Sequence, residues 1–261
     1  MKGAIIGDII GSRYVLDNTS DYDFELFGPG CDFTDSTICT VAVADAVLRD
    51  RGYAETMRAW CRRYPHPKGG YDSYFLNRIM RSDLSPYNGF GNGSAGRVSP
   101  IAWFYDDEGD VRLQAEASAA VTHNHPEGIK GSVAVAVAIL RMRQASVKDP
   151  YIFDDVADEF YYDEYTCSEA FDRLPERGYF DETCQGCVPL SLYIAATATS
   201  FEDAIRQAVS YGGDSGTVGA IVGSLAEARF HVPPEMLATA MSLLPAEMRR
   251  IVEALDARLG R

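Results

Sequence analysis

The chain has 261 residues, enough for one large domain or two small ones. Its hydrophobic content of 46% and ordinary glycine and proline usage are typical of a globular protein. The net charge of −14, without any run rich in lysine or arginine, argues against a nucleic-acid-binding surface.

The N-terminal run MKGAIIGDIIGS is interrupted by Asp8, which makes it too short and too broken for the apolar core of a signal peptide. No window is long and apolar enough for a membrane span. Without a secretory signal the six cysteines are expected to be reduced thiols, and Cys184-x-x-Cys187 has no second pair at zinc-site spacing. These features together predict a cytoplasmic protein without membrane contact.

Helical patterns follow one another along the chain, separated by turn signals. We predict helices over 3–12, 33–50, 56–64, 71–81, 94–105, 111–123, 126–144, 150–160, 167–176, 187–197, 201–210, 234–243 and 245–259, and one that begins at Asp214. There is no internal repeat, no convincing linker and no alternation of strands with helices. The pattern predicts an all-α protein in which residues 1–261 form a single compact multi-helix domain.

The segment GSVAVAVAIL alternates in a way that, taken alone, is typical of a strand. Its alanine richness and length, and the proline at position 126, instead favour a buried helix over 126–144.

Two helix starts are rich in side-chain oxygen. Thr34 and Asp214 stand where N-caps belong, and hydroxyl residues follow both within the first turn. Such a cluster suits either a hard cation such as magnesium or a phosphate, and the alternative is an ordinary capped, buried helix. After the second start, Gly219 and Gly223 lie on one helical face, which predicts close packing against another backbone.

Six fragments, in order along the chain, resemble the ADP-ribosylglycohydrolase family. They are GAIIGDIIGS (3–12), FTDST (33–37), GNGSAGRVSP (91–100), THNHPEGIKG (122–131), CQGCVP (184–189) and GGDSGTVGAIVG (212–223). The resemblance implies a compact all-helical fold with a two-magnesium site between helix starts. It also implies cleavage of the N- or O-glycosidic bond that joins ADP-ribose to a protein side chain or a small molecule.

The family's metal motifs usually read Thr-Asp-Asp-Thr early and Asp-x-Asp-Thr late. The positions of this chain that match are Thr34, Asp35, Asp214 and Thr217, with Asp35 and Asp214 as the catalytic carboxylates. Ser36 stands where the second early Asp is expected, and Gly216 where the second late Asp is expected. Upstream, Val15 stands where relatives carry a Glu.

Magnesium pairs need carboxylates to offset the repulsion between the ions. Ser36 offers only a neutral oxygen, and Gly216 offers no side chain. We therefore expect one weak magnesium site or none, with Asp8, Asp17 and Asp32 as acids that could compensate.

The ligand-binding apparatus implied by the resemblance is retained. It comprises the glycine-rich loop Asn92, Gly93, Ser94 and Gly96, the segment His123, Asn124, His125 and Gly128, and Ser215. Backbone N–H groups in such a loop can face a phosphate. Alternatively, His123 and His125 cap the helix that starts at Pro126, and the Gln185-Gly186 turn either lines the cleft or only packs.

Three functions remain open at this point. The first is a family member that still binds ADP-ribose or a related nucleotide but has impaired or absent hydrolysis. The second is an active magnesium-dependent hydrolase, and the third is a non-catalytic scaffold or regulatory protein. The expected partners are ADP-ribose or an ADP-ribosylated protein or small molecule.

Overall fold

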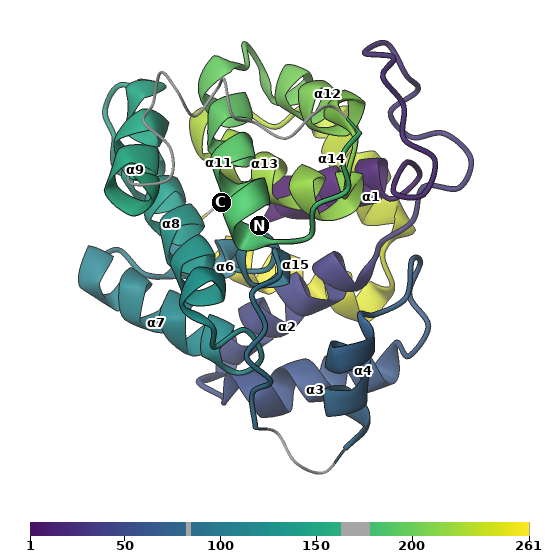
Figure 1. The fold of residues 1–261 in the computed structure, drawn as a ribbon, viewed down its shortest axis with the longest axis vertical. Helices are drawn as coiled ribbons and strands as arrows, with labels where there is room; N and C mark the ends of the chain where they lie inside the picture. Colours follow the sequence, from purple (N-terminus) through teal and green to yellow (C-terminus); the bar gives the residue numbers. More distant parts are fainter. Residues whose placement is uncertain (82–84, 163–177, 261) are drawn as a thin grey trace.

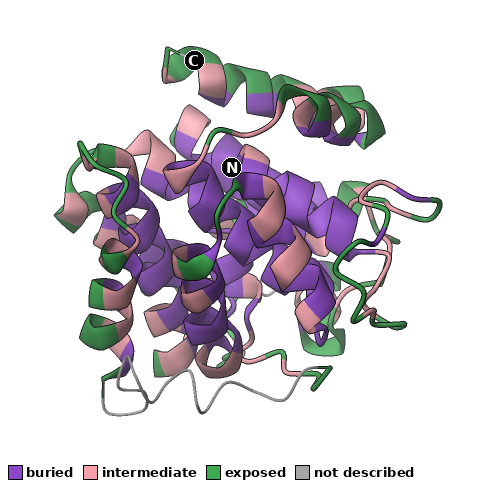
Figure 2. Cartoon of the chain, turned by 90° about the horizontal axis from the view of Figure 1, so that it is seen from above, coloured by how far each residue is buried: buried purple, intermediate pink, exposed green. Residues whose placement is uncertain are grey.

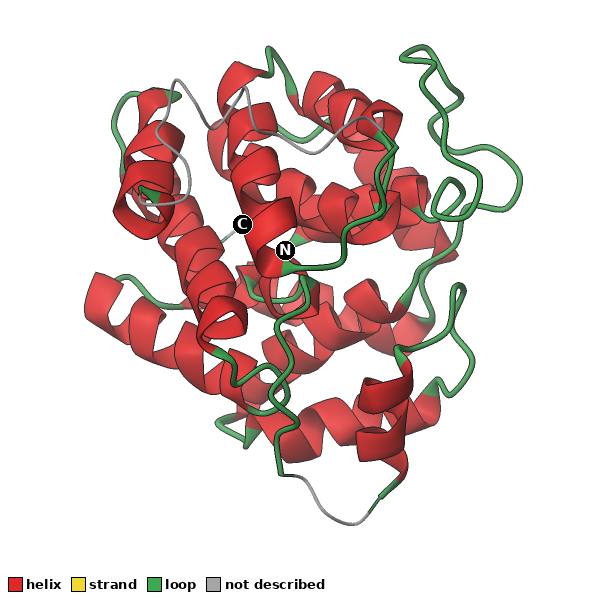
Figure 3. Cartoon of the chain, in the orientation of Figure 1, coloured by secondary structure: helices red, strands yellow, loops and turns green. Residues whose placement is uncertain are grey.

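The computed structural model describes residues 1–81, 85–162 and 178–260, and in these ranges it consists of helices joined by loops (Figures 1 and 3). The helices are α1 (Lys2–Gly11), α2 (Asp35–Arg49), α3 (Tyr53–Arg63), α4 (Ser73–Met80), α5 (Gly93–Gly96), α6 (Ser99–Phe104), α7 (Glu108–Ala120), α8 (Pro126–Gln144), α9 (Tyr151–Tyr161), α11 (Cys184–Thr197), α12 (Phe201–Tyr211), α13 (Ser215–Arg229), α14 (Pro234–Leu243) and α15 (Ala246–Arg258). Extended pairing in the described ranges is limited to two isolated bridges, Thr34 with Lys68 and Gly91 with Thr183. The predicted all-α fold is confirmed, and the helix expected over 167–176 lies outside the described residues.

Helix α13 packs against α1 at the centre of the fold. The glycines of α1 recur every four residues at Gly3, Gly7 and Gly11, and they meet a matching row of small residues on α13. A Cβ atom added to Gly7 would lie 1.9 Å from the carbonyl oxygen of Gly219, and one added to Gly223 would lie 2.1 Å from that of Gly3. The close backbone packing predicted from the glycine row of α13 is therefore present.

The remaining helices surround this pair and enclose one apolar core. Figure 2 shows the central helices buried along most of their length, whereas the helix that ends at the C-terminus is exposed on its outer side. The alternating segment of α8 is helical, and its residues 131–140 are all buried. Burial on every face explains why the segment lacks the polar stripe of an amphipathic helix.

Several helices differ from their predicted bounds, and α3 and α7 each begin three residues before the predicted start. The single helix expected over 94–105 is two short ones, because Pro100 occupies the first turn of a new helix, α6. Helix α11 begins at Cys184, three residues before the predicted start, with the Thr183 side chain accepting from the Gly186 N–H. None of the helices in the described ranges is long and apolar enough to cross a bilayer.

Candidate active site

Asp8 joins the first helix to the start of α2. It is fully buried, and its carboxylate accepts hydrogen bonds from the backbone N–H and hydroxyl groups of both Thr34 and Thr37, at 2.5–3.2 Å. Desolvation raises its pKa to about 6, against the opposing effect of these four bonds. Asp8 therefore holds the N-terminus of α2 in place, a role that differs from the compensating metal ligand expected from the sequence.

The two oxygen-rich helix starts meet. Thr34 caps α2 by accepting from the Ser36 N–H, and Asp214 caps α13 by accepting from the Thr217 N–H. Across the junction the Ser36 hydroxyl lies 3.4 Å from the Thr217 hydroxyl. Both predicted caps are confirmed, and the early and late motifs lie side by side.

The matched carboxylates, Asp35 and Asp214, interact electrostatically at this junction. Desolvation raises the pKa of Asp35 to about 7, with further contributions from the negative charges of Asp8 and Asp214. Desolvation also raises the pKa of Asp214. Three acids thus share a small volume with no cationic side chain among the causes of these shifts.

The positions that depart from the family pattern lie at the same junction. A Cβ atom on Gly216 would be 3.3 Å from Val15 Cγ2, 3.7 Å from Asp8 Oδ1 and 3.9 Å from Asp214 Oδ1. Ser36 is the residue that contacts Thr217. A valine, a serine and a glycine therefore stand, beside the existing acids Asp8 and Asp214, at the positions where the resemblance expects additional carboxylates.

The glycine-rich loop is tied to this junction by Asn92. The Asn92 side chain donates to Asp214 Oδ2 at 2.9 Å. A Cβ atom on Gly96 would lie 2.9 Å from the Thr217 methyl group and 3.9 Å from the Ser36 hydroxyl. Gly93 has more room, because its added Cβ would come no closer than 3.7 Å to the His123 ring.

The segment that precedes α8 packs against this loop. The buried Ser94 hydroxyl donates to the Gly128 carbonyl at 2.8 Å. The buried His123 ring pairs with the Thr122 hydroxyl at 2.7 Å, and burial followed by the nearby charge of Arg97 lowers its pKa to about 3. His123 is therefore a neutral imidazole at neutral pH.

The other two residues of this segment have local partners. The Asn124 side-chain oxygen accepts from the Asn88 N–H at 2.7 Å. His125 is the N-cap of α8, with Nδ1 accepting from the Glu127 N–H. The capping interpretation thus holds for His125 and not for His123.

Several sequence candidates lie away from the carboxylates or are engaged elsewhere. The buried Ser215 hydroxyl donates to the Gly11 carbonyl at 2.9 Å, which places it in the contact between α1 and α13. Gly186 is part of the cap of α11. Asp17 and Asp32 are exposed, and the Asp32 side chain accepts from the Phe33 N–H.

Glu182 is an acid of this region that the sequence analysis missed. Its carbonyl oxygen accepts from the Asn92 N–H at 2.6 Å, and the pKa of its side chain is raised by desolvation and then by the charge of Asp214. The only signal was its position just before the CQGCVP fragment, which does not show that the backbone there pairs with the glycine-rich loop.

The donor set does not fit a pair of magnesium ions. Asp35 and Asp214 are the carboxylates at matched positions, while all the hydrogen bonds that Asp8 accepts come from α2 and its cap. Among the described residues no three His, Cys, Asp or Glu side chains are placed to hold one metal ion. Two carboxylates and the hydroxyls of Ser36 and Thr217 suit at most one ion that keeps several of its waters.

Comparisons with known proteins show which family this chain is similar to. The ADP-ribosylglycohydrolase family model matches residues 1–259. An uncharacterized protein of Archaeoglobus fulgidus is 26% identical over 78% of this chain and 73% of its own length. ADP-ribosylhydrolase ARH3 of Bos taurus is 23% identical over 88% of this chain and 83% of its own length.

A solved structure described as an "ADP-ribosylglycohydrolase-related protein complex" superposes with a TM-score of 0.77 at 22% identity, covering 98% of this chain and 95% of that one. At this identity the superposition supports the fold, and the match of the family model over nearly the whole chain supports the family. The chain therefore belongs to the ADP-ribosylglycohydrolase family.

Proposed function

We propose that this protein binds ADP-ribose, free or attached to a protein or small molecule, and that its hydrolysis of the glycosidic bond is impaired or absent. The observation that carries the proposal is the convergence of Val15, Ser36 and Gly216 on the junction between Asp35 and Asp214. All three are positions at which the family pattern has an acid.

The binding half of the proposal rests on the glycine-rich segment that begins at Asn92 and forms the short helix α5. At one end the Asn92 side chain donates to Asp214, and at the other Gly96 lies so close to Thr217 that an added Cβ atom would be 2.9 Å from its methyl group. Gly93 and Ser94 provide backbone N–H groups at a helix start, an arrangement that favours a phosphate. The loop lies directly beside the two carboxylates, so a diphosphate bound there would place the attached ribose near them.

The catalytic half rests on charge. A magnesium pair would supply the polarisation of the substrate and the orientation of water. Asp35 and Asp214 are too few to balance such a pair, and the added space at Gly216 is bordered by a Val15 methyl group. We therefore propose a single weak magnesium site or none, and correspondingly slow chemistry.

A working hydrolase is the second candidate, favoured by Glu182. Desolvation, and then the negative charge of Asp214, raise the pKa of the Glu182 side chain. The acids near the junction therefore include one that the family motifs did not predict. An acid at this position could assist a single ion or a water molecule.

Two measurements test the two halves of the proposal, calorimetry for binding and a release assay for hydrolysis. Calorimetry should show saturable binding of ADP-ribose to the wild-type protein, and Gly93→Asp should abolish it because a carboxylate beside the loop repels the diphosphate. Ser242→Asp adds the same charge at an exposed residue of α14 and should bind like wild type. Release of ADP-ribose from a modified peptide in magnesium should be slow or undetectable.

Absence of binding would refute the binding half of the proposal and leave the scaffold alternative. Efficient magnesium-dependent release by the wild-type protein would refute the catalytic half and establish the second candidate.

A further inference from the structure

A cleft lies at the opposite end of α2 from the candidate active site. It has a volume of about 670 Å³, and residues of α2, α3 and α15 line it. Pockets of this size are typical of small-molecule sites. Because α2 has 15 residues, the cleft lies about 20 Å from the Asp35 end of the helix.

The side chains that line the cleft carry a small net positive charge, although the net charge of the whole protein is −14. The charged residues in its lining are the arginines Arg49, Arg51, Arg63 and Arg250 and the acids Asp45, Glu55 and Glu247. The lining therefore carries one more cationic than acidic side chain, against the sign of the molecule as a whole.

Two of these arginines are already paired. Arg49 Nε lies 2.6 Å from Asp45 Oδ1, and Arg63 Nη1 lies 2.8 Å from Glu247 Oε2. The Arg63 guanidinium also lies over the Trp60 ring, 4.8 Å from its centroid. These contacts hold two guanidinium groups in place at the wall of the cleft.

The other two, Arg51 and Arg250, are exposed, and within the described ranges no acid lies at ion-pair distance from either. They come from different elements, the loop after α2 and the helix α15, and both line the same cleft. Guanidinium groups present planar pairs of N–H donors that match the oxygens of a phosphate group.

We propose that this cleft is a binding site for a small molecule that carries a phosphate or diphosphate group, with Arg51 and Arg250 as its principal contacts. The site is separate from the carboxylate junction and does not depend on the function proposed for that junction. The paired Arg49 and Arg63 line the wall of the cleft. The two free arginines outnumber Glu55, the one lining acid without an ion pair among the described residues, and they supply the net positive charge that the ligand neutralises.

Trp60 provides a reporter inside the cleft. Its indole N–H donates to Asp45 Oδ2 at 2.9 Å, and both residues belong to the lining. The other tryptophan of the chain, Trp103, lies on α6 and is not part of that lining. The indole ¹H–¹⁵N signals of the two residues therefore distinguish binding in the cleft from binding elsewhere.

The test is a titration with inorganic pyrophosphate, followed by nuclear magnetic resonance. The Trp60 signal should shift and saturate while that of Trp103 stays in place, and sodium chloride at the same ionic strength should not reproduce the shift. Arg51→Ala/Arg250→Ala should raise the Kd about ten-fold or more, because it removes the charge-assisted hydrogen bonds to the phosphate oxygens. Both side chains are exposed and without acid partners, so the variant should fold normally.

Arg81→Ala/Arg258→Ala is the matched control. It removes two positive charges at exposed residues outside the cleft and should leave the Kd within about two-fold of the wild-type value. A Trp60 signal that does not move, that responds equally to chloride, or that shifts with the same Kd in the Arg51→Ala/Arg250→Ala variant would overturn the proposal.

Discussion

The Cγ2 atom of Val15 lies 3.3 Å from the point where a Cβ atom on Gly216 would stand. Two positions that are 201 residues apart in the chain, both without the expected acid, are thus neighbours at the start of α13. Each alone would remove one carboxylate. We propose that, together with Ser36, they leave the junction of Asp35 and Asp214 with too few carboxylates for a magnesium pair.

Restoring these acids should restore chemistry. We expect Val15→Glu/Ser36→Asp/Gly216→Asp to gain magnesium-dependent release of ADP-ribose from a modified arginine or serine peptide. Each single restoration should gain little, because residues that act as one unit are far from additive. Gly216 lies in α13 with ordinary helical backbone, so positive φ does not oppose the aspartate.

Melting temperatures measured alongside the assay separate loss of fold from lack of activity. A folded triple variant that binds two metal ions and releases no ADP-ribose would show that the candidate active site has changed its ligand. A wild-type rate as high as that of the triple variant would show that another acid, such as Glu182, has taken over.

The contact between α1 and α13 should tolerate no added methyl group. Gly7→Ala places a Cβ atom 1.9 Å from the Gly219 carbonyl oxygen, so two helix backbones must separate. We expect a loss of more than about 3 kcal/mol in the free energy of unfolding, measured with urea. Gly93→Ala is the matched control, since its Cβ meets only ordinary contacts at 3.7 Å, and it should cost less than about 1 kcal/mol.

Local signals in the sequence were enough to predict this packing and the two capped helix starts at Thr34 and Asp214. Small residues every four positions mark a face that another backbone approaches, and the oxygen-bearing residues Thr34 and Asp214 mark N-caps without any tertiary information. The alternating segment of α8 was correctly assigned by length and by Pro126. These features depend on neighbours within a few residues, which is why they can be read from the chain.

The features that were missed depend on contacts between distant segments. The four hydrogen bonds of Asp8 come from residues 26 and 29 positions away. Glu182 meets Asn92 through a backbone bond across 90 residues. Nothing in the local pattern around either acid specifies its partner. Only the fold shows whether the carboxylate is already hydrogen-bonded within the protein or can bind a metal ion or a ligand.

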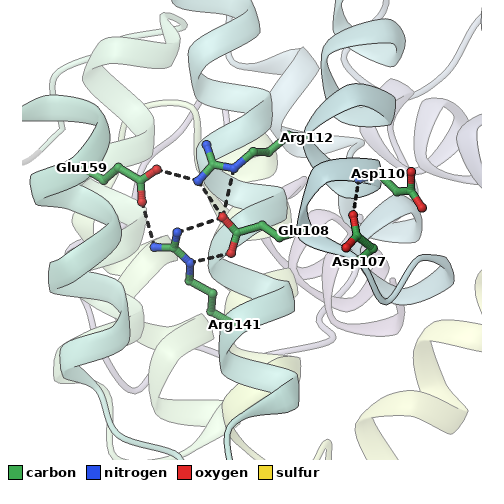
Figure 4. Close-up of polar contacts among 6 residues, drawn as sticks. All are labelled: Asp107, Glu108, Asp110, Arg112, Arg141 and Glu159. Carbon is green, nitrogen blue, oxygen red and sulfur yellow. Dashed lines mark hydrogen bonds and ion pairs between the residues drawn. The ribbon is translucent and has the colours of Figure 1, made fainter.

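The ion-pair cluster between α7, α8 and α9 should stabilise the protein at neutral pH. Glu108 accepts from Arg112 and Arg141, and both arginines also contact Glu159, as Figure 4 shows. The hydrogen bond from Arg141 is the main cause that lowers the pKa of Glu108 to about 2. A lowered carboxyl pKa gives stability that is present above the unfolded value of about 4.5 and is lost as the pH falls toward 2.

Glu108→Gln should therefore cost about 1 kcal/mol at pH 7, a modest value because the cluster is partly exposed, and less at pH 3. Glu116→Gln is the control, since Glu116 is exposed on the same helix without an ion-pair partner among the described residues. Equal losses for the two variants in urea unfolding at pH 7 would contradict a stabilising role for the cluster.

His123 should make stability fall in weak acid. The imidazole is buried beside the Arg97 guanidinium, and its pKa is lowered from 6.5 to about 3. Between these values the unfolded chain binds a proton that the folded protein does not. Stability therefore rises with pH in this window, and as the pH falls below about 6.5 His123 contributes a loss of up to about 1.4 kcal/mol per pH unit.

His123→Gln removes the titrating group and retains a side chain that can pair with the Thr122 hydroxyl. Between pH 6.5 and pH 5 the free energy of unfolding, measured with urea, should fall in both proteins. The fall should be about 1–2 kcal/mol smaller in the variant than in wild type. His66→Gln replaces an exposed imidazole and should follow the wild-type curve. Parallel curves for wild type and His123→Gln would mean that the folded protein protonates His123 as readily as the unfolded chain does, which would require the contact with Thr122 to open in weak acid.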